Sequence, residues 1–214
     1  MLQVKILPVT PFAQNCSIVW DSESKEAIII DAGGDAQRIQ QEVQALGIQV
    51  KQLWLTHGHL DHAGAVGELA RIWSIPVIGP HKEDQFWLDM LQDVSAQYGF
   101  PIPEPVHVST WLEGNEVLTL GKHAFEVRFA PGHTPGHVIF YNAEHRLLWA
   151  GDVLFKESIG RTDFPRGNHQ QLIDSIHSTC FTLPDETQFI PGHGEMSTIG
   201  HEKKFNPFVS GRAG

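Results

Sequence analysis

The densest group of metal-binding residue types in the chain is the segment Thr56-His-Gly-His-Leu-Asp-His-Ala-Gly64. It places His57, His59, Asp61 and His62 within six residues, directly after a short apolar run. Imidazole nitrogen and carboxylate oxygen are ordinary ligands of Zn²⁺, whereas protonated imidazoles crowded together without a metal repel one another. The alternative, polar side chains in a solvated loop, would require a chance gathering of four ligand types. The segment therefore predicts a metal site.

Three later segments each place one more ligand-type side chain at the end of an expected strand. These are His133 in Pro131-Gly-His-Thr-Pro-Gly-His137, Asp152 in Ala150-Gly-Asp-Val153 and His193 in Pro191-Gly-His-Gly194. Taken singly, Pro-Gly-His is more often a polar turn than a site. Together with the first cluster, the three segments indicate one shared metal centre.

Other histidines are expected to have lesser roles. His137 is expected to donate or accept a supporting hydrogen bond beside the metal ligands, with a solvent-facing turn as the alternative. The remaining histidines have no motif around them and are expected in surface or capping positions: His81, His107, His123, His145, His169, His177 and His201.

Hydrophobic periodicity predicts the elements that position these residues. In the first half, apolar runs predict strands at 4–9, 17–20, 27–31 and 50–55, the third buried on both faces. A helix is predicted from a cap at Asp35 to a stop at Gly47, followed by helices over 63–73 and 82–98, the last with Phe86, Met90 and Val94 on one face. The segment 56–64, which contains the first four candidate ligands, thus lies between a predicted strand and a predicted helix, where α/β proteins usually have their sites.

The second half of the chain repeats this organisation. Strands are predicted at 117–120, 124–129, 138–141, 146–149 and 188–190, with a helix over 168–180. Two halves, each with several strands and flanking helices, predict an α/β fold with two sheets face to face and helices outside.

Composition limits the class of protein. The chain has 214 residues and a formal charge of −10, from 15 Lys and Arg against 25 Asp and Glu, which disfavours nucleic acid as a partner. No apolar run is long enough to span a bilayer, and the first residues do not read as a signal peptide. We expect a soluble, cytoplasmic protein with a single domain over 1–214, and a monomer or small oligomer without a membrane partner.

The ordered set His57-x-His59-x-Asp61-His62, His133, Asp152 and His193 resembles the signature of the metallo-β-lactamase superfamily. The resemblance implies an αββα sandwich with a metal site at one edge. It also implies that His57, His59 and His133 bind one metal, that Asp61, His62 and His193 bind a second, and that Asp152 bridges both. Two divalent ions are expected, with Zn²⁺ favoured and iron or manganese also compatible with the ligands.

Within that superfamily, the segments 151–155, 159–167 and 200–208 resemble the glyoxalase II branch, in particular its short single-domain bacterial proteins of the YcbL type. The resemblance implies hydrolysis of S-D-lactoylglutathione to D-lactate and glutathione by a hydroxide held between two metals, which Asp61 would orient. Longer glyoxalase II enzymes hold glutathione in a C-terminal helical region, which is not expected here because the chain ends about twenty residues after His193. Arg161 is the candidate for binding the substrate's anionic groups; the alternative is an ion pair with Asp163. Arg166 and the Lys203–Lys204 pair are further cations to test, although a solvated tail is the expected place of the two lysines.

The main alternative function is persulfide oxidation. The Gly160–Phe164 segment is also similar to that of persulfide dioxygenases, in which one iron would be held by His57, His133 and Asp152. A secreted β-lactamase is disfavoured by Asp152 and by the lack of a leader, and a nuclease by the acidic charge. A non-enzymatic module would be expected to have lost ligands, and no ligand is missing.

Overall fold

The computed structural model describes residues 1–210, and its first sheet comes from the first half of the chain. In spatial order this five-stranded sheet contains β1 (Leu2–Val9), β2 (Gln14–Asp21), β3 (Glu26–Ile30), β4 (Gln49–Trp54) and β5 (Val77–Ile78). β3 runs parallel to β4 and is buried along nearly its whole length, as its continuous apolar run predicts. Helices α1 (Ala36–Leu46), α2 (Leu60–Ala63) and α3 (Val66–Trp73) follow its strands.

The second sheet is built from the second half. It has six strands in the order β13 (Ser197–Thr198), β12 (Gln188–Pro191), β9 (Leu147–Gly151), β8 (Val138–Asn142), β7 (His123–Phe129) and β6 (Val117–Leu120). A small separate hairpin pairs β10 (Leu154–Phe155) with β11 (Ser158–Ile159). Two further helices are α6 (His169–Ser175), which continues into a π turn over Ile176–Cys180, and α7 (Ile199–Phe205).

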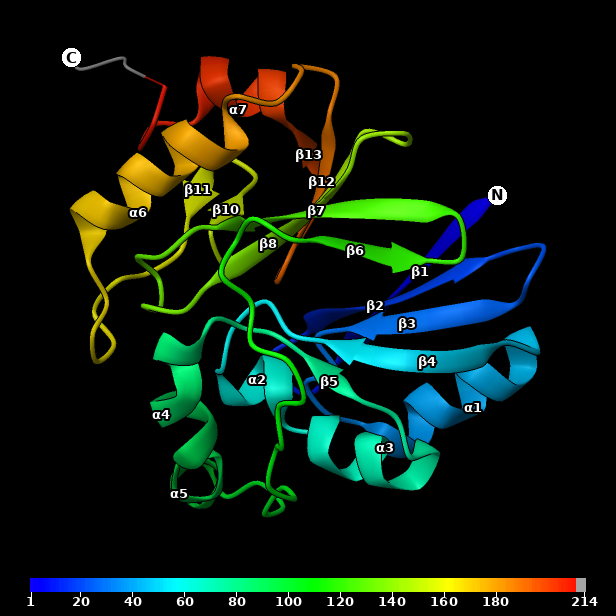
Figure 1. Cartoon of the computed structure of the whole chain (residues 1–214). Coiled ribbons are helices and arrows are strands. Elements are labelled where there is room, and N and C mark those ends of the chain that lie inside the picture. Colours follow the sequence, from blue (N-terminus) through cyan, green and yellow to red (C-terminus); the bar gives the residue numbers. More distant parts are fainter. Residues whose placement is uncertain (211–214) are drawn as a thin grey trace.

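The two sheets pack face to face, and helices cover both outer surfaces (Figure 1). α6 and α7 cover the six-stranded sheet, whereas α1 and α3 cover the five-stranded one. Between the sheets, the rings of Phe125 and Phe140 lie 5.1 and 5.2 Å from that of Trp54, and all three side chains are fully buried. The predicted α/β sandwich is therefore confirmed. No helix of residues 1–210 is long and apolar enough to cross a membrane.

Two of the predicted helices are broken. In place of one helix over 63–73, the chain forms the two helices α2 and α3. α2 begins earlier than predicted, at Leu60, and ends before Gly64, where a side chain would collide with the carbonyl oxygen of Gly33. The 82–98 helix is a 3₁₀ turn (Lys82–Asp84) followed by α4 (Gln85–Asp89) and α5 (Leu91–Tyr98), which meet at Met90.

The buried face of α4 and α5 also differs from the prediction. Met90 is exposed, and the buried apolar side chains are Trp87, Leu88 and Leu91. Trp87 packs its ring 4.4 Å from that of His59, a contact that periodicity within the segment does not reveal. The tertiary contact therefore decides which face is buried.

Asp35 occupies the predicted start of α1, but its side chain caps nothing. Its backbone is left-handed, with a φ of 53°, and its carboxylate accepts a hydrogen bond from the amide of Thr10 in the β1–β2 turn. Gly47 ends α1 in the left-handed conformation, as predicted.

Backbone hydrogen bonds join the two sheets at the edge where the ligand-type residues gather. The amide of Val138 donates to the carbonyl of Thr56, and the amide of Asn15 donates to the carbonyl of Gly192. The carboxyl ends of β4, β9 and β12 consequently meet at this edge. The segments carrying His57, Asp152 and His193 follow those ends directly.

Candidate metal centre

The first group of converging ligand atoms comes from His57, His59 and His133. His59 Nδ1 lies 3.2 Å from His57 Nε2 and 3.0 Å from His133 Nε2. Two ligand atoms bound to one zinc ion at a tetrahedral angle lie about 3.4 Å apart. The three nitrogens, which come from two segments 74 residues apart in the chain, are thus spaced as ligands of one ion would be.

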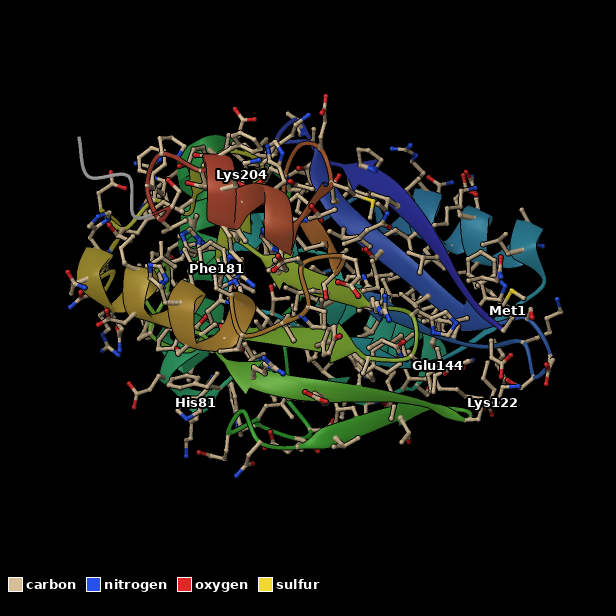
Figure 2. The ribbon with its side chains drawn as sticks, turned by 90° about the horizontal axis from the view of Figure 1, so that it is seen from above. Met1, His81, Lys122, Glu144, Phe181 and Lys204 are labelled. Carbon is tan, nitrogen blue, oxygen red and sulfur yellow. The ribbon has the colours of Figure 1, made fainter. Side chains whose placement is uncertain are left out.

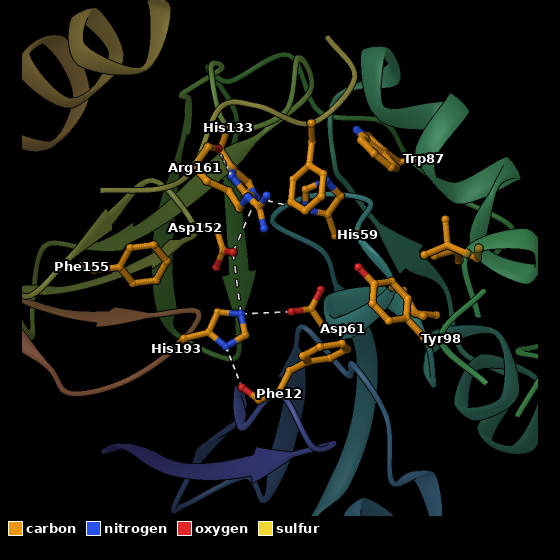
Figure 3. A pocket seen from close by; sticks show the side chains of 14 residues that line it. Phe12, His59, Asp61, Trp87, Tyr98, His133, Asp152, Phe155, Arg161 and His193 are labelled. Carbon is orange, nitrogen blue, oxygen red and sulfur yellow. Dashed lines mark hydrogen bonds and ion pairs between the residues drawn. The ribbon is translucent and has the colours of Figure 1, made fainter. Parts of the chain in front are cut away.

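The second group is Asp61, His62 and His193. His193 Nε2 lies 3.0 Å from Asp61 Oδ2 (Figure 3). His62 Nε2 lies 3.9 Å from the same oxygen. This is the same set of three residues to which the resemblance to the metallo-β-lactamase superfamily assigns a second metal.

Asp152 lies between the two groups. Its Oδ2 is 3.5 Å from His133 Nε2 and 3.7 Å from His193 Nε2, and its Oδ1 is 3.2 Å from His62 Nε2. The carboxylate therefore faces a histidine of the first group and two of the second, which is where a bridging ligand is expected.

Hydrogen bonds from the far side orient the imidazoles. His62 Nδ1 donates to Asp31 Oδ2 (2.9 Å), His133 Nδ1 to the carbonyl of Arg161 (2.7 Å) and His193 Nδ1 to the carbonyl of Phe12 (3.0 Å). Each bond places a proton on Nδ1 and turns Nε2 toward the centre, where a metal ion could take the place of any proton on it. Metal-binding histidines commonly have such a partner.

Asp31, the partner of His62, is a residue of the candidate site that sequence reasoning missed. It is buried and also accepts hydrogen bonds from the amide and the hydroxyl of Thr56, at 2.8 and 2.7 Å. Asp31 directly follows the buried apolar strand β3. An acidic residue at the end of such a strand was the sequence signal that could have marked it as part of the site.

His137 has the supporting role predicted for it. It is fully buried, its ring stacks on that of His57 at 4.6 Å, and its Nε2 accepts a hydrogen bond from the amide of Asp152 at 3.1 Å. The solvent-facing alternative is wrong. His137 thus orients both a histidine and the central aspartate.

Asp84 is a second buried carboxylate that the sequence did not reveal. Its Oδ2 accepts hydrogen bonds from the amide of Gly58 (2.9 Å) and the hydroxyl of Thr134 (2.8 Å), and its Oδ1 accepts from the amide of Gly136 (2.6 Å). Gly58 lies between His57 and His59, whereas Thr134 follows His133. Asp84 therefore ties together the two segments that supply the first group of ligands.

Burial and neighbouring charges shift the pKa values of these histidines in opposite directions. Burial lowers the pKa of His57 and His133, and lowers that of His59 to about 3, so these imidazoles are neutral and able to bind a metal. Burial also disfavours the charged form of His62, but the carboxylates of Asp152, Asp31 and Asp61 outweigh it and raise its pKa.

The donor set fits divalent metal ions. His62 Nε2 and Asp152 Oδ1 are buried and lie 3.2 Å apart as an ion pair, but neither atom makes a hydrogen bond of good geometry with a residue that the structure describes. A side chain at position 192 would come within 2.0 Å of Asp152 Oδ1, so Gly192 keeps the space beside the carboxylate free. Buried polar atoms whose hydrogen bonds are poor are costly unless a ligand satisfies them. Nitrogen and carboxylate oxygen suit zinc, iron and manganese alike.

A cavity of about 390 Å³ opens onto this centre. Apart from the ligand-type residues, its lining is mostly apolar: Phe12, Leu60, Trp87, Leu91, Val94, Tyr98, Phe155 and Phe164. Arg161 is the cation among the described lining residues. Its guanidinium donates two 2.6 Å hydrogen bonds to Asp163 and lies 4.2 Å from the centre of the Phe164 ring.

The two tail lysines that the sequence offers for anion binding, Lys203 and Lys204, lie elsewhere. Lys203 pairs with Asp185 at 2.6 Å and also donates to the carbonyl of Leu183, and Lys204 lies over the ring of Phe205. None of these residues lines the cavity.

A family model for the metallo-beta-lactamase superfamily matches residues 9–193. The chain belongs to this superfamily. It is 42% identical over 213 residues to a protein of Haemophilus influenzae named hydroxyacylglutathione hydrolase GloC, a match that covers 99% of this chain and all of the relative. Membership in this superfamily and the likeness to this relative support a metal-dependent hydrolase that uses divalent metal ions.

Solved structures agree with this membership. The structure of BLEG-1, a B3 metallo-beta-lactamase, matches with a TM-score of 0.89 and 38% identity, covering 99% of this chain and all of that one. TTHA1623 in a di-iron-bound form matches at 0.87 and 33%, covering 96% and 100%. ETHE1 from Myxococcus xanthus matches at 0.81 and 26%, covering 99% and 86%.

Proposed function

We propose that this protein hydrolyses thioesters with two divalent metal ions and that its substrate is S-D-lactoylglutathione, giving D-lactate and glutathione. The observation that carries the proposal is the pair of three-residue ligand groups on either side of Asp152, at the floor of one cavity. The 42% identity to a hydroxyacylglutathione hydrolase over the whole chain supports the choice of thioester.

In this proposal one ion is held by His57, His59 and His133 and the other by Asp61, His62 and His193, with Asp152 between them. Divalent ions held in this way bring the pKa of a bound water near neutrality and polarise a carbonyl oxygen. We favour Zn²⁺, although iron and manganese suit the same atoms and the similar TTHA1623 structure is di-iron-bound.

Asp61 is the proposed catalytic residue, because it lines the cavity and keeps one fifth of its side chain exposed. Its Oδ2 pairs with His193, which leaves Oδ1 able to accept a hydrogen bond from the attacking water. The interaction would direct the water's remaining lone pair toward the thioester carbonyl. The thiolate that leaves is stable at neutral pH, so no side chain has to protonate it.

Arg161 is the proposed contact for an anionic group of the substrate. Its position on the cavity wall supports this role, and the hydrogen bonds to Asp163 fix the guanidinium beside the opening. The apolar wall would meanwhile exclude water from the scissile bond. We further propose that the protein acts in the cytoplasm.

Persulfide oxidation by one iron is the second candidate. His57, His133 and Asp152 lie together as two histidines and one carboxylate, and the likeness to ETHE1 favours this reading. Two experiments run side by side separate the candidates. The iron- and zinc-loaded proteins are assayed for loss of S-D-lactoylglutathione and for oxygen uptake with glutathione persulfide. Thioester loss without oxygen uptake is expected, and the reverse pattern would make the protein a dioxygenase.

A further inference from the structure

A second group of ligand-type side chains lies at the other end of the sandwich. His123 begins β7, whereas the segment carrying His133 follows the end of that strand. The side chain of His123 points inward with those of Phe125 and Val127, and only 1% of it is exposed. This buried imidazole takes no part in the centre described above.

Two side chains from the β8–β9 turn reach over His123. Glu144 Oε2 lies 3.1 Å from His123 Nδ1 and 3.9 Å from His145 Nδ1, and the two imidazole rings are 5.4 Å apart. Glu144 is exposed and His145 is about one third exposed, so solvent reaches the group. Figure 2 shows Glu144 at the same end of the molecule as Met1 and Lys122.

We propose that His123, Glu144 and His145 form a further binding site for a divalent transition-metal ion such as Zn²⁺. One nitrogen or oxygen from each residue lies within 4.8 Å of the other two, compared with about 3.4 Å for two ligands of one zinc ion. Rotation of the exposed Glu144 and of the partly exposed His145 would close this difference, and His145 would exchange the 2.9 Å hydrogen bond between its Nδ1 and Asn142 Oδ1 for the ion. Two imidazoles and one carboxylate form a set that zinc, nickel and copper accept.

A buried carboxylate, Asp21, lies behind His123 on the side away from Glu144, which distinguishes this group from a chance pairing of surface residues. His123 Nε2 is buried without a hydrogen-bond partner in the described chain, and Asp21 Oδ2 lies 3.8 Å from it. A histidine that binds a metal through one nitrogen commonly directs the other at a carboxylate. Asp21 is buried and is held in place by the amide of Glu23 and by the amino group of Met1.

Both carboxylates are charged at neutral pH. The amide of Glu23 lowers the pKa of Asp21, and the hydrogen bond from His123 lowers that of Glu144. Asp21 belongs to β2 of the first sheet, whereas His123 belongs to β7 of the second. An ion bound here would therefore fasten the ends of both sheets, through Asp21 on one side and the β8–β9 turn on the other.

The test compares the metal content of the full-length protein with that of Glu144→Gln and of the double variant Glu144→Gln/His145→Ala. Each is dialysed against micromolar Zn²⁺, and the zinc per chain is measured by elemental analysis. The double variant is expected to bind about one equivalent less than the unchanged protein. His169→Ala, which removes an exposed histidine on α6, is the control and should lose none.

A second readout is thermal. Because an ion that binds only the folded state stabilises it, added Zn²⁺ should raise the midpoint of unfolding by roughly 5 °C more in His169→Ala than in Glu144→Gln. Thioester hydrolysis should be unchanged in both variants. Equal zinc content in the unchanged protein, Glu144→Gln and the double variant would overturn the proposal, and Glu144→Gln keeps the test valid should the double variant fold poorly.

Discussion

At the scale of single residues, the ligand types could be predicted because the motif gathers them within a few positions. The structure brings His57, His59 and His133 together, and it places Asp61 with two more histidines, in the two sets that the sequence implied. That these atoms bind metal stays a prediction. Asp31 and Asp84 could not be predicted, since each is recognised only by partners 25 to 52 residues away in the chain.

Asp61 offers the sharpest single-residue test of the mechanism. Replacing it by Ala should lower kcat by about 10²- to 10⁴-fold, because the attacking water loses its orienting carboxylate. Steady-state kinetics and circular dichroism measure the effect while confirming the fold. Asp174→Asn, an exposed carboxylate on α6, is the matched control and should keep full activity. An Asp61→Ala protein with unchanged kcat would refute the assigned role.

Arg161 gives a second prediction about a single residue. In Arg161→Ala, KM for S-D-lactoylglutathione should rise by about tenfold with little change in kcat, because an anion contact common to substrate and transition state is lost. The imidazole of His133 is held by the main chain of Arg161, so its orientation should persist. Arg166→Ala, which removes the cation over the ring of Phe86, is the control. If KM is the same in all three proteins, the guanidinium serves only its ion pair with Asp163.

At the scale of elements, strands were more predictable than helices. The apolar runs of β3 and β8 are buried along their length, so local pattern and tertiary structure agree. The buried face predicted for the 82–98 helix was wrong because Trp87 packs against the ring of His59, a contact that the local sequence does not reveal. The prediction that Asp35 caps α1 was wrong, because its carboxylate accepts a hydrogen bond from the amide of Thr10 in the neighbouring turn.

The link that Asp84 makes between two ligand-bearing segments gives a prediction about pH. Burial raises the pKa of Asp84 to about 6, above its ordinary 3.8. Between these two pH values Asp84 keeps its proton in the folded protein but has released it in the unfolded chain. The stability that the protonated Asp84 contributes is therefore fully present below about pH 4 and is lost as the pH rises through about 6. From pH 4 to pH 7, the free energy of unfolding of the metal-free protein should fall by about 3 kcal/mol relative to Asp84→Asn.

Denaturant unfolding at several pH values measures this difference. Thr134→Val removes one of the hydrogen-bond donors to Asp84 while leaving its carboxyl group, and it should therefore keep the pH dependence. A difference between the metal-free protein and Asp84→Asn that stays constant from pH 4 to pH 7 would show that Asp84 does not titrate in this range.

At the scale of the whole molecule, the sandwich could be predicted because each half of the sequence contains its own set of strands. Its core is apolar and separate from the metal ligands: one cluster lies between the sheets around Trp54 and Phe140, and two others lie beneath the outer helices. The small hairpin of β10 and β11 could not be predicted, since two-residue strands carry no periodicity. That residues 1–214 act as a single domain stays a prediction.

This separation of core and ligands predicts the effect of chelation. A strong chelator should abolish hydrolysis while leaving the far-ultraviolet circular dichroism spectrum unchanged at 25 °C. The midpoint of thermal unfolding should fall by several degrees, because a ligand of the folded state has been removed. Loss of the spectrum on chelation would mean that the metals hold the fold together.

The central claim is hydrolysis of a thioester at the paired ligand groups. We would follow the loss of thioester absorbance from S-D-lactoylglutathione, using metal-free protein reloaded separately with Zn²⁺, Mn²⁺ or Fe²⁺, beside Asp61→Ala treated in the same way. The account predicts turnover with at least one metal, at two equivalents per chain in the ligand groups, and its near loss in the variant. No turnover with any metal, or equal turnover in the variant, would contradict it.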